Sequence, residues 1–185
     1  MKQLAGFVVG LAGLAVAGAI YAYGGFYNVA AVEPHAALTD WVLHTTMQQS
    51  VKARARTITP PPPPGNRDLG EAFRGFDEMC VQCHGAPGKE PGVVGKGLQP
   101  PPPGLGDAAK RWNRAELFWI VKNGIRMTGM PAFGPTHSDE QIWALVAFLQ
   151  RLPNTSAAQY KEMEKQYAAR GKEAQPAQKG QEHKH

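Results

Sequence analysis

Cysteine is scarce in this chain, because its 185 residues include only Cys80 and Cys83. A structural zinc site usually needs four Cys or His ligands, and no second pair at zinc-finger spacing follows these two. Basic runs with interleaved aromatic residues are also missing, and the formal net charge is only +5. These absences argue against a zinc domain and against a nucleic-acid-binding protein.

The two cysteines belong to one short motif, Cys80-Val81-Gln82-Cys83-His84, which is the C-x-x-C-H signature for covalent attachment of a c-type haem. Two thiols at this spacing can form thioethers with the haem vinyl groups, and the adjacent histidine then lies under the iron. A redox-active dithiol shares the C-x-x-C spacing, but it is typical of a thioredoxin-like βαβ setting. The flanking residues here show helical patterns and Pro/Gly loops, so we predict one covalently bound haem c.

A candidate for the second axial ligand lies in the loop Gly129-Met130-Pro131-Ala132-Phe133-Gly134. A methionine between glycine and proline on a loop is poorly explained as core filling, and a thioether is the soft axial ligand that raises the potential of a haem. We therefore predict that Met130 is the distal ligand. Met127 is a rival that lacks the Met-Pro context, and His137 is a further candidate whose surroundings are more typical of a surface histidine.

The N-terminal segment has one charged residue, Lys2, before an apolar stretch from Leu4 to about Tyr23 that is long enough to cross a bilayer as a helix. Aromatic residues gather at its far end, where amphipathic rings favour the membrane interface. A cleaved signal peptide is the alternative, because Ala15-Val16-Ala17 offers a small-residue cleavage site. We predict an uncleaved anchor over residues 1–27 that places the rest of the chain on the periplasmic side of a bacterial inner membrane.

Residues 28–66 are predicted to be a connector. The stretch from His35 to about Arg56 reads as a helix that packs on the haem domain or on a membrane partner. Five consecutive prolines, Pro60 to Pro64, cannot continue a helix and predict a stiff polyproline spacer. The lone histidines of this segment match no ligand spacing, so we interpret them as surface or packing residues. They are His35 and His44.

Residues 67–153 contain the patterns of a small helical domain. Asp68 is predicted to cap a first helix that runs to about Met79, so that the haem motif follows at its end. We expect this helix to cross the last helix of the domain, with Phe76 against Trp143 or Ala147. A Gly/Pro loop between them occupies residues 85–106.

Two later helices begin at capping boxes. Asn113 with Glu116 starts a helix over 115–123, for which Gly124 is a natural stop. Ser138 with Gln141 starts a helix from Asp139 to about Leu152, which Pro153 ends. Residues 154–185 are predicted to be a polar helix from Ser156 to Arg170 and then a disordered tail beyond Gly171.

Taken together, these motifs resemble a class I c-type cytochrome of the membrane-anchored, mono-haem type, with an all-α haem domain. The resemblance covers about Arg67 to Pro153, and it rests on C-V-Q-C-H-G, the P-G-L of the proline loop, N-G-I-R-M-T-G-M-P-A-F-G and the helix I-W-A-L-V-A-F-L. It implies that Cys80 and Cys83 hold the porphyrin and that His84 and Met130 ligate the iron. It also implies that a carbonyl of the proline loop, best matched by Pro103, accepts the N–H of the proximal imidazole.

A haem with two protein ligands has no position for a substrate, so the chain is predicted to be an electron carrier and not an enzyme. The leading hypothesis is a periplasm-facing cytochrome that passes single electrons between a respiratory donor and an oxidase or reductase. The first alternative is a fixed haem c subunit of a larger oxidoreductase complex. The second alternative is a haem enzyme or gas sensor with an open sixth position.

The charge distribution predicts something about the redox partner. Between Gly85 and Met130 the sequence has seven cations and three anions. Such a sorting is often only a solvated surface, but it also fits a positive face that steers a partner with an acidic docking face. The cations are Lys89, Lys96, Lys110, Arg111, Arg114, Lys122 and Arg126.

Overall fold

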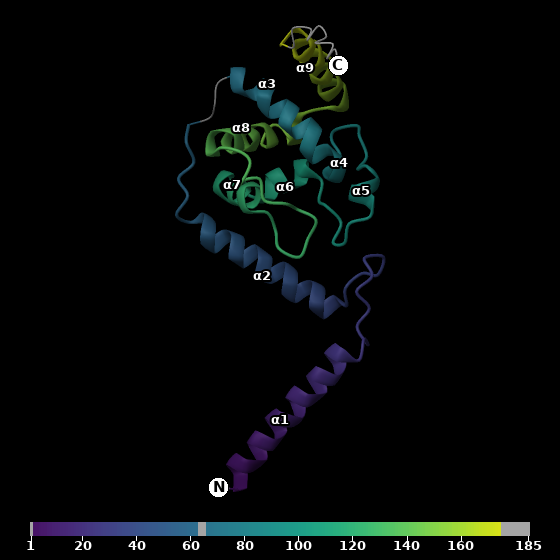
Figure 1. Cartoon of the computed structure of the whole chain (residues 1–185). Coiled ribbons are helices and arrows are strands. Elements are labelled where there is room, and N and C mark those ends of the chain that lie inside the picture. The colour runs from purple at the N-terminus through teal and green to yellow at the C-terminus, as the bar shows by residue number, and fades with distance from the viewer. Residues whose placement is uncertain (1, 63–65, 175–185) are drawn as a thin grey trace, which may run out of the picture. The chain divides into compact units, whose positions relative to one another are not determined.

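The computed structural model describes residues 2–62 and 66–174 (Figure 1). The regular secondary structure of these residues is helical, and the one β-type pairing among them is the isolated bridge between Ala86 and Lys89. The all-α prediction is therefore confirmed. The helices are α1 (Lys2–Tyr23), α2 (Ala37–Ala55), α3 (Asn66–Gly75), α4 (Val81–His84), α5 (Val93–Lys96), α6 (Leu105–Arg111), α7 (Arg114–Asn123), α8 (Asp139–Leu149) and α9 (Ala157–Ala174), with a π-helical turn at Phe76–Cys80 and a 3₁₀ turn at Leu152–Asn154.

The chain divides into two compact units, residues 1–34 and 35–185. The first unit contains α1, which is long and apolar enough to cross a membrane by length and composition. None of its residues is buried. A signal sequence near the N-terminus meets the same criterion, so the helix agrees with an anchor without deciding whether it is cleaved.

In the second unit, the first helix of the haem domain continues through the haem motif. α3, the π-helical turn and α4 follow one another directly, so that Cys80 to His84 are helical. The predicted end at Met79 is therefore wrong, and the helix stops at Gly85, whose φ of 66° is a conformation that glycine adopts without strain. The predicted N-cap is also wrong, because α3 begins at Asn66 and Asp68 lies inside its first turn.

The core forms where α3 crosses α8, as predicted, and the small residue Ala72 is buried there. Phe73 and Phe76 both pack on Phe148, with ring centroids 5.7 Å and 5.1 Å apart. Phe76 was predicted to lie against Trp143 or Ala147, and its ring contacts are with Phe148 and Tyr160. Trp143 turns toward α7 instead and stacks on Phe118 at 4.1 Å, because α8 has neighbours on two sides.

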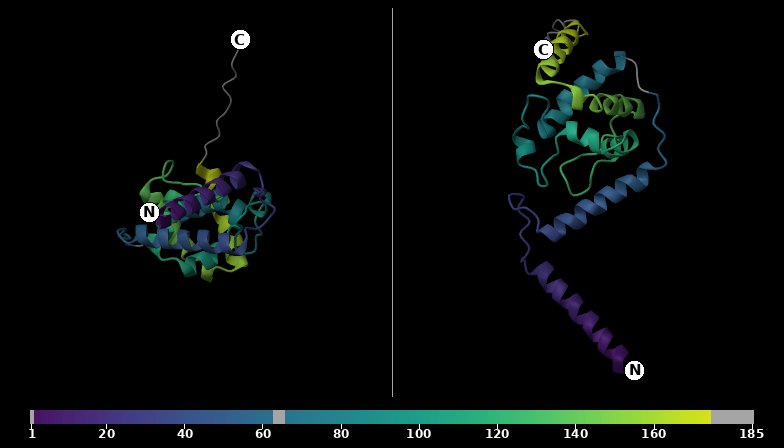
Figure 2. Two further views of the ribbon diagram at one scale, coloured as in Figure 1. Left: turned by 90° about the horizontal axis from the view of Figure 1, so that it is seen from below. Right: turned by 180° about the vertical axis from the view of Figure 1, so that it is seen from behind.

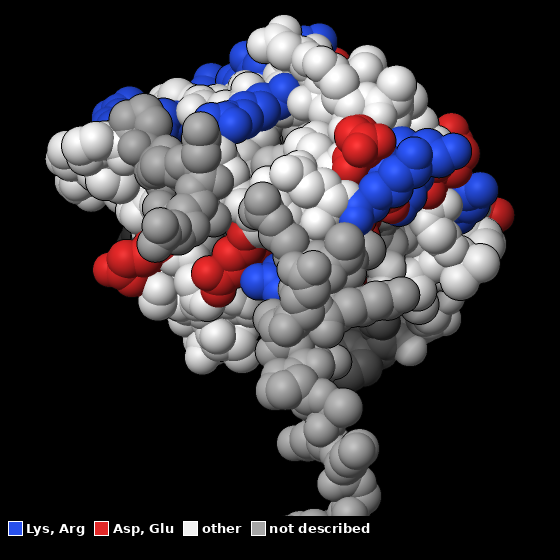
Figure 3. All heavy atoms as spheres, turned by 90° about the horizontal axis from the view of Figure 1, so that it is seen from above, with Lys and Arg blue, Asp and Glu red and all other residues white. Residues whose placement is uncertain are grey.

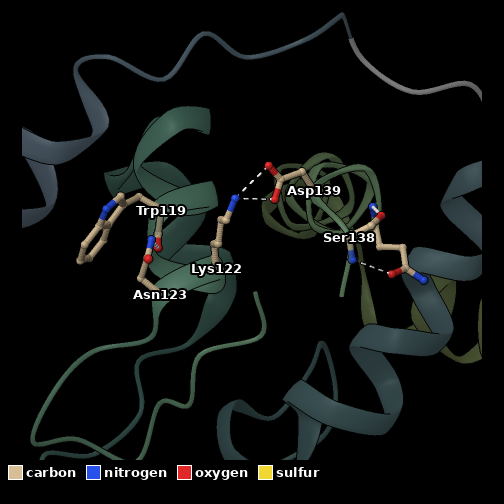
Figure 4. A network of polar contacts seen from close by, with 6 residues as sticks. Trp119, Lys122, Asn123, Ser138 and Asp139 are labelled. Atoms are coloured by element: carbon tan, nitrogen blue, oxygen red, sulfur yellow. Dashed lines mark hydrogen bonds and ion pairs between the residues drawn. The ribbon is translucent and has the colours of Figure 1, made fainter. Parts of the chain in front are cut away.

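Both predicted capping boxes are confirmed, at Asn113 with Glu116 in α7 and at Ser138 with Gln141 in α8. In the second of them the backbone N–H of Ser138, which Figure 4 labels, donates to Gln141 Oε1 at 2.9 Å. Gly124 ends α7 with a φ of 65°, also as predicted. These local hydrogen bonds fix where the two helices begin, and with them the loop that joins α7 to α8.

Removal of the α8 cap should destabilise the domain measurably. The hydroxyl of Ser138 accepts the backbone N–H of Gln141 at 3.3 Å. We expect Ser138→Ala to lower the free energy of unfolding by about 1 kcal/mol, the usual cost of losing such a cap. Denaturant titration of the haem-loaded protein measures this loss. Ser138→Thr retains a hydroxyl and should lose much less, whereas equal losses in the two variants would contradict a capping role.

α9 belongs to the core of the second unit, although its sequence predicted a polar helix. Tyr160 is only 1% exposed, and its ring lies 5.3 Å from Phe73 and 6.1 Å from Phe76. Its hydroxyl donates to Asp77 at 2.7 Å. The helix also runs past Arg170 to Ala174, and the rest of the predicted tail, residues 175–185, lies outside the described residues.

The burial of Tyr160 predicts a loss of stability at alkaline pH. Burial, followed by the bond to Asp77, raises the pKa of Tyr160 well above its usual value of 10.0. Above about pH 10 the unfolded chain releases this proton while the folded protein retains it, so stability falls as the pH rises. We expect Tyr160→Phe to lose about 1 kcal/mol at neutral pH and to show a shallower alkaline fall. Urea titrations from neutral to alkaline pH test this, and parallel curves for the two proteins would refute it.

The connector helix α2 packs on the haem domain. Val51 and Ala55 are buried, and α2 lies against α7. Both views in Figure 2 show α2, in blue, alongside the rest of the second unit. Beyond α2, the guanidinium of Arg114 in α7 donates to the carbonyl oxygen of Pro61 at 2.7 Å. Pro60 to Pro62 are not helical, as predicted, and the last two prolines of the run lie outside the described residues.

Candidate functional site

The haem motif lies at the C-terminal end of the continuous helix, with Cys80 buried and Cys83 half-buried. Their spacing of three residues places them on the same side of a helix. The following segment folds back tightly against them, because a Cβ on Gly95 would lie 2.4 Å from the carbonyl oxygen of Cys83. The backbone N–H of Gly92 also donates to the carbonyl oxygen of Gln82 at 2.9 Å. The close approach of Gly95 and the hydrogen bond from Gly92 thus hold the backbone around both thiols in place.

His84 has one ring nitrogen fixed by the proline loop. Its Nδ1 lies 2.8 Å from the carbonyl oxygen of Pro103. A carbonyl oxygen only accepts, so Nδ1 carries the proton and Nε2 keeps its lone pair for a metal. Burial lowers the pKa of His84, while the bond to Pro103 acts in the opposite direction. The imidazole is therefore held in its neutral form, which is the form that coordinates iron.

The environment of the cysteines differs from that of a redox-active dithiol. Burial, and secondly the neighbouring Cys83, raises the pKa of the Cys80 thiol to about 12. Reactive cysteines have lowered pKa values, since the thiolate is the nucleophile. Across residues 2–62 and 66–174, no group of three or more His, Cys, Asp or Glu side chains is arranged to hold a metal ion. The raised pKa of Cys80 argues against a redox-active dithiol and is compatible with haem attachment at this motif.

The loop that carries Met130 is fastened at both of its ends. The backbone N–H of Ile125 donates to the carbonyl oxygen of Met130 at 3.2 Å, and the N–H of Met130 donates to Thr128 Oγ1 at 3.1 Å. Further along, Phe133 and Gly134 donate to carbonyl oxygens of α7 at 3.1 Å and 2.9 Å. Met130 itself is half-buried and packs on the core.

The two rival candidates in this region have different surroundings. Met127 is 82% exposed, and its φ of 60° turns it away from regular structure. His137 is half-buried, lies edge-on to Phe133 at 5.6 Å and shares a 2.9 Å hydrogen bond with Thr136 Oγ1. Of the connector histidines, His44 is hydrogen-bonded to Gln48 at 2.7 Å.

Two residues that support this site escaped the sequence interpretation. Thr128 fixes the backbone of Met130, and the signal for it was a threonine two residues before the methionine, a spacing at which hydroxyls often bond to backbone N–H groups. Gly95 leaves room for Cys83. Nothing in the local sequence of Gly95 indicates this contact, because it depends on how the loop folds back.

The donor set fits a haem c by its chemistry. It comprises two thiols on one side of a helix, a neutral imidazole with a fixed tautomer, and a thioether on an anchored, half-buried loop. Apolar side chains from α7 and α8 complete the surrounding core. A thioether-linked porphyrin with His and Met as axial ligands needs these donors and an apolar surrounding.

Several of the cations predicted to form a positive face are ion-paired. Lys89 contacts Asp77 and Glu164, and Lys110 contacts Asp107. Lys122 donates to both carboxylate oxygens of Asp139 at 2.6 Å and 2.9 Å, as Figure 4 shows. On the face that carries α3 and α9, blue and red side chains lie side by side (Figure 3). The cations of segment 85–130 without an ion pair among the described residues are Lys96, Arg111, Arg114 and Arg126.

Comparison with known families places the site in a broader class. Residues 67–149 match the family described as Cytochrome C oxidase, cbb3-type, subunit III. No curated protein matches the chain. The matched segment includes the C-x-x-C-H motif, the Met130 loop and α8, and it leaves α1, α2 and α9 outside. The chain therefore carries a c-type cytochrome domain, for which the family implies haem c as cofactor and electron transfer as function.

Proposed function

We propose that the chain is a membrane-anchored, mono-haem electron-transfer cytochrome that works on the periplasmic side of a bacterial inner membrane. In this proposal Cys80 and Cys83 hold the porphyrin, and His84 Nε2 and the Met130 thioether are the axial ligands. The carbonyl oxygen of Pro103 holds the orientation and tautomer of His84. A haem bound in this way supplies a one-electron redox couple at raised potential. The observation that carries the proposal is the 2.8 Å contact of His84 Nδ1 with the Pro103 carbonyl oxygen, combined with the anchored Met130 loop.

A closed iron distinguishes this function from catalysis. With His84 and Met130 both bound, no coordination position is left for a substrate or gas. The test is carbon monoxide added to the reduced, native protein at neutral pH, followed by its optical spectrum. We expect an unchanged low-spin spectrum. A carbon monoxide adduct would overturn the carrier and favour the open-site enzyme or gas sensor.

Membrane attachment is part of the proposal. α1 supplies an apolar helix of spanning length, and an anchor holds a redox domain near its partners at high effective concentration. Membranes washed with alkaline carbonate should retain the haem protein, and its N-terminal sequence should begin before Ala15. Protease added to spheroplasts should cleave the haem domain if it faces the periplasm. Recovery in the soluble fraction would reject the anchor.

The domain organisation follows from these assignments. We propose that residues 1–27 are the anchor, residues 28–66 the connector and residues 67–153 the haem domain. The C-terminal segment, residues 154–185, then includes α9. Since α9 inserts Tyr160 into the core, we expect it to be required for a stable haem domain.

The carrier can act as a free shuttle or as a fixed subunit. The family name refers to a subunit of a cytochrome c oxidase, which supports an oxidase or a larger complex as the partner. Solubilisation of membranes in mild detergent separates the two arrangements. Co-migration with a catalytic subunit favours the fixed subunit, whereas a single small species favours the shuttle.

We further propose that the partner presents an acidic docking face. Among the cations of segment 85–130, Lys96, Arg111 and Arg126 are exposed and have no ion pair among the described residues. Exposed charges steer association in a salt-dependent way. We expect replacement of these three by glutamine to weaken the salt dependence of electron transfer. Lys110→Gln, which removes a cation already paired with Asp107, is the control and should change it little.

A further inference from the structure

The connector helix α2 has two chemically different sides. Val51 and Ala55, four residues apart, form the side buried against α7. Leu38 and Val42, also four residues apart, are exposed, at 71% and 44%. Thirteen residues separate Leu38 from Val51, which corresponds to a rotation of about 220° around a helix. The exposed pair is therefore turned away from the packed side, with Leu38 about 140° from Val51 and about 100° from Ala55 around the helix.

The exposed side carries a defined set of residues, which we call the outer stripe. Trp41, 64% exposed, lies beside Leu38 and Val42 in its first half. Lys52 and Arg56 lie in its second half, fourteen and eighteen residues after Leu38, or about four and five whole turns. Asp40 is the acidic residue of α2, and it falls about 200° from Leu38, outside the stripe. The outer stripe is thus apolar at one end and cationic at the other.

The position of α2 in the chain limits what the stripe can meet. Only residues 24–36 separate it from α1, and thirteen residues span on the order of 45 Å when fully extended. This link contains one charged side chain, Glu33, and its valines Val29 and Val32 are 88% and 89% exposed. Exposed apolar residues therefore continue from the end of α1 into the stripe.

We propose that the outer stripe lies on the surface of the bilayer that α1 spans, and that it thereby sets which face of the haem domain points toward the membrane. The inference rests on the proposed membrane anchor. Tryptophan favours the boundary between headgroups and acyl chains, and helices with one apolar side lie in that plane. Lys52 and Arg56 complement anionic headgroups.

Packing of the buried side of α2 transmits this orientation. Val51 and Ala55 hold the helix on α7, and the bond from Arg114 to the carbonyl oxygen of Pro61 fixes the segment that follows it. α2 and the haem domain therefore move together. A bilayer that binds the outer stripe selects one orientation of the whole domain.

Quenching of Trp41 by lipid tests the proposal. The full-length, haem-loaded chain is placed in nanodiscs of phosphatidylcholine and phosphatidylglycerol, with or without bromine near the top of the acyl chains. The emission of Trp41 is the difference between the native chain and Trp41→Phe. We expect brominated lipid to remove most of this difference and to leave the emission of Trp41→Phe unchanged. A Trp41 emission that brominated lipid does not reduce would overturn the proposal.

A pair of charge variants provides the matched comparison. Leu38→Glu with Val42→Glu should restore Trp41 emission in brominated nanodiscs and speed amide hydrogen exchange in the first half of α2. Val93→Glu with Val94→Glu adds the same charge at exposed valines of α5 and should leave both signals as in the native chain. Identical behaviour of the two variants would contradict lipid contact at the stripe.

Two remaining outcomes separate this inference from its foundations. If α1 were not an anchor, the haem absorbance would be absent from the nanodisc fraction. If only the stripe proposal were wrong, the haem absorbance would stay in that fraction and Trp41 would remain unquenched. If Trp41 stays unquenched in nanodiscs but its emission shifts when a co-migrating membrane complex is present, a protein partner covers the stripe and the lipid proposal is wrong.

Discussion

Replacement of Met130 with alanine is expected to lower the reduction potential of the haem and to abolish the weak sulfur-to-iron band in the near infrared. A neutral thioether disfavours the ferric charge, so its loss favours oxidation. Axial ligands set haem potentials over a range of roughly 0.8 V, and we expect a fall that is a substantial fraction of this range. Redox titration and the near-infrared spectrum of the ferric protein measure the two effects.

Met127→Ala is the matched control for this experiment. Met127 lies only three residues from Met130, and its replacement removes the same kind of side chain. Unlike Met130, however, Met127 is largely exposed to solvent. We expect it to retain both the band and the potential. If Met127→Ala lost the band instead, the ligand assignment would be reversed. If native protein lacked the band and its reduced form were high-spin, the sixth position would be open and the carrier hypothesis would fail.

Gly124→Ala should have the second large effect, although residue 124 contacts no ligand atom in the proposed site. Its φ of 65° and ψ of −175° are essentially restricted to glycine, and strain of this kind costs about 1–3 kcal/mol. A Cβ here would also lie 2.7 Å from the carbonyl oxygen of Met130 and 2.8 Å from the backbone nitrogen of Ala132. These are backbone atoms, so the whole Met130 loop has to move.

The expected signature of Gly124→Ala is selective. The thioether attachment at Cys80 and Cys83 should survive, while the sulfur-to-iron band disappears and the free energy of unfolding falls. Gly104→Ala is the control, because residue 104 is an exposed glycine with a φ of −59°, and a Cβ there would meet only Asp107 Oδ2, at 4.0 Å. A Gly124→Ala protein with native stability and an intact band would show that the loop does not depend on this glycine.

Features that depend on neighbouring residues were predictable from sequence. The capping boxes at Asn113 and Ser138 need partners only three residues away, and both formed as predicted. The glycine stop at Gly124 is local in the same way. The haem motif is also local, since its five consecutive residues are enough to predict the cofactor. The proposed role of Met130 rests on a dipeptide context and an intact loop.

Features that depend on the packing of distant segments were not predictable in this way. Asp68 is a good capping residue, but the helix begins earlier at Asn66. Phe76 lies on the apolar face of its helix, but nothing in the nearby sequence indicates that its ring packs on Phe148 and not on Trp143. The identity of the carbonyl that holds His84, nineteen residues away at Pro103, came from a family resemblance and not from spacing.

α9 shows how a mostly polar composition can hide a core residue. Tyr160, Met163 and Tyr167 occur at intervals of three and four residues, which is a helical face. Charged residues between them dominate the average hydropathy of the segment, so the sequence predicts a polar helix. The three side chains nevertheless face the core, with Tyr167 5.1 Å from Phe73.

Because α9 packs on the core, the segment needed for a folded haem domain is longer than the segment that matches the cytochrome family. The family match ends at residue 149, before the 3₁₀ turn and α9. A chain cut at Pro153 would leave Phe73 and Phe76 without the Tyr160 ring and would uncover the carboxylate of Asp77. A fragment designed from the match alone would therefore expose an aromatic surface to water, and expression of the isolated domain should include residues up to at least Ala174.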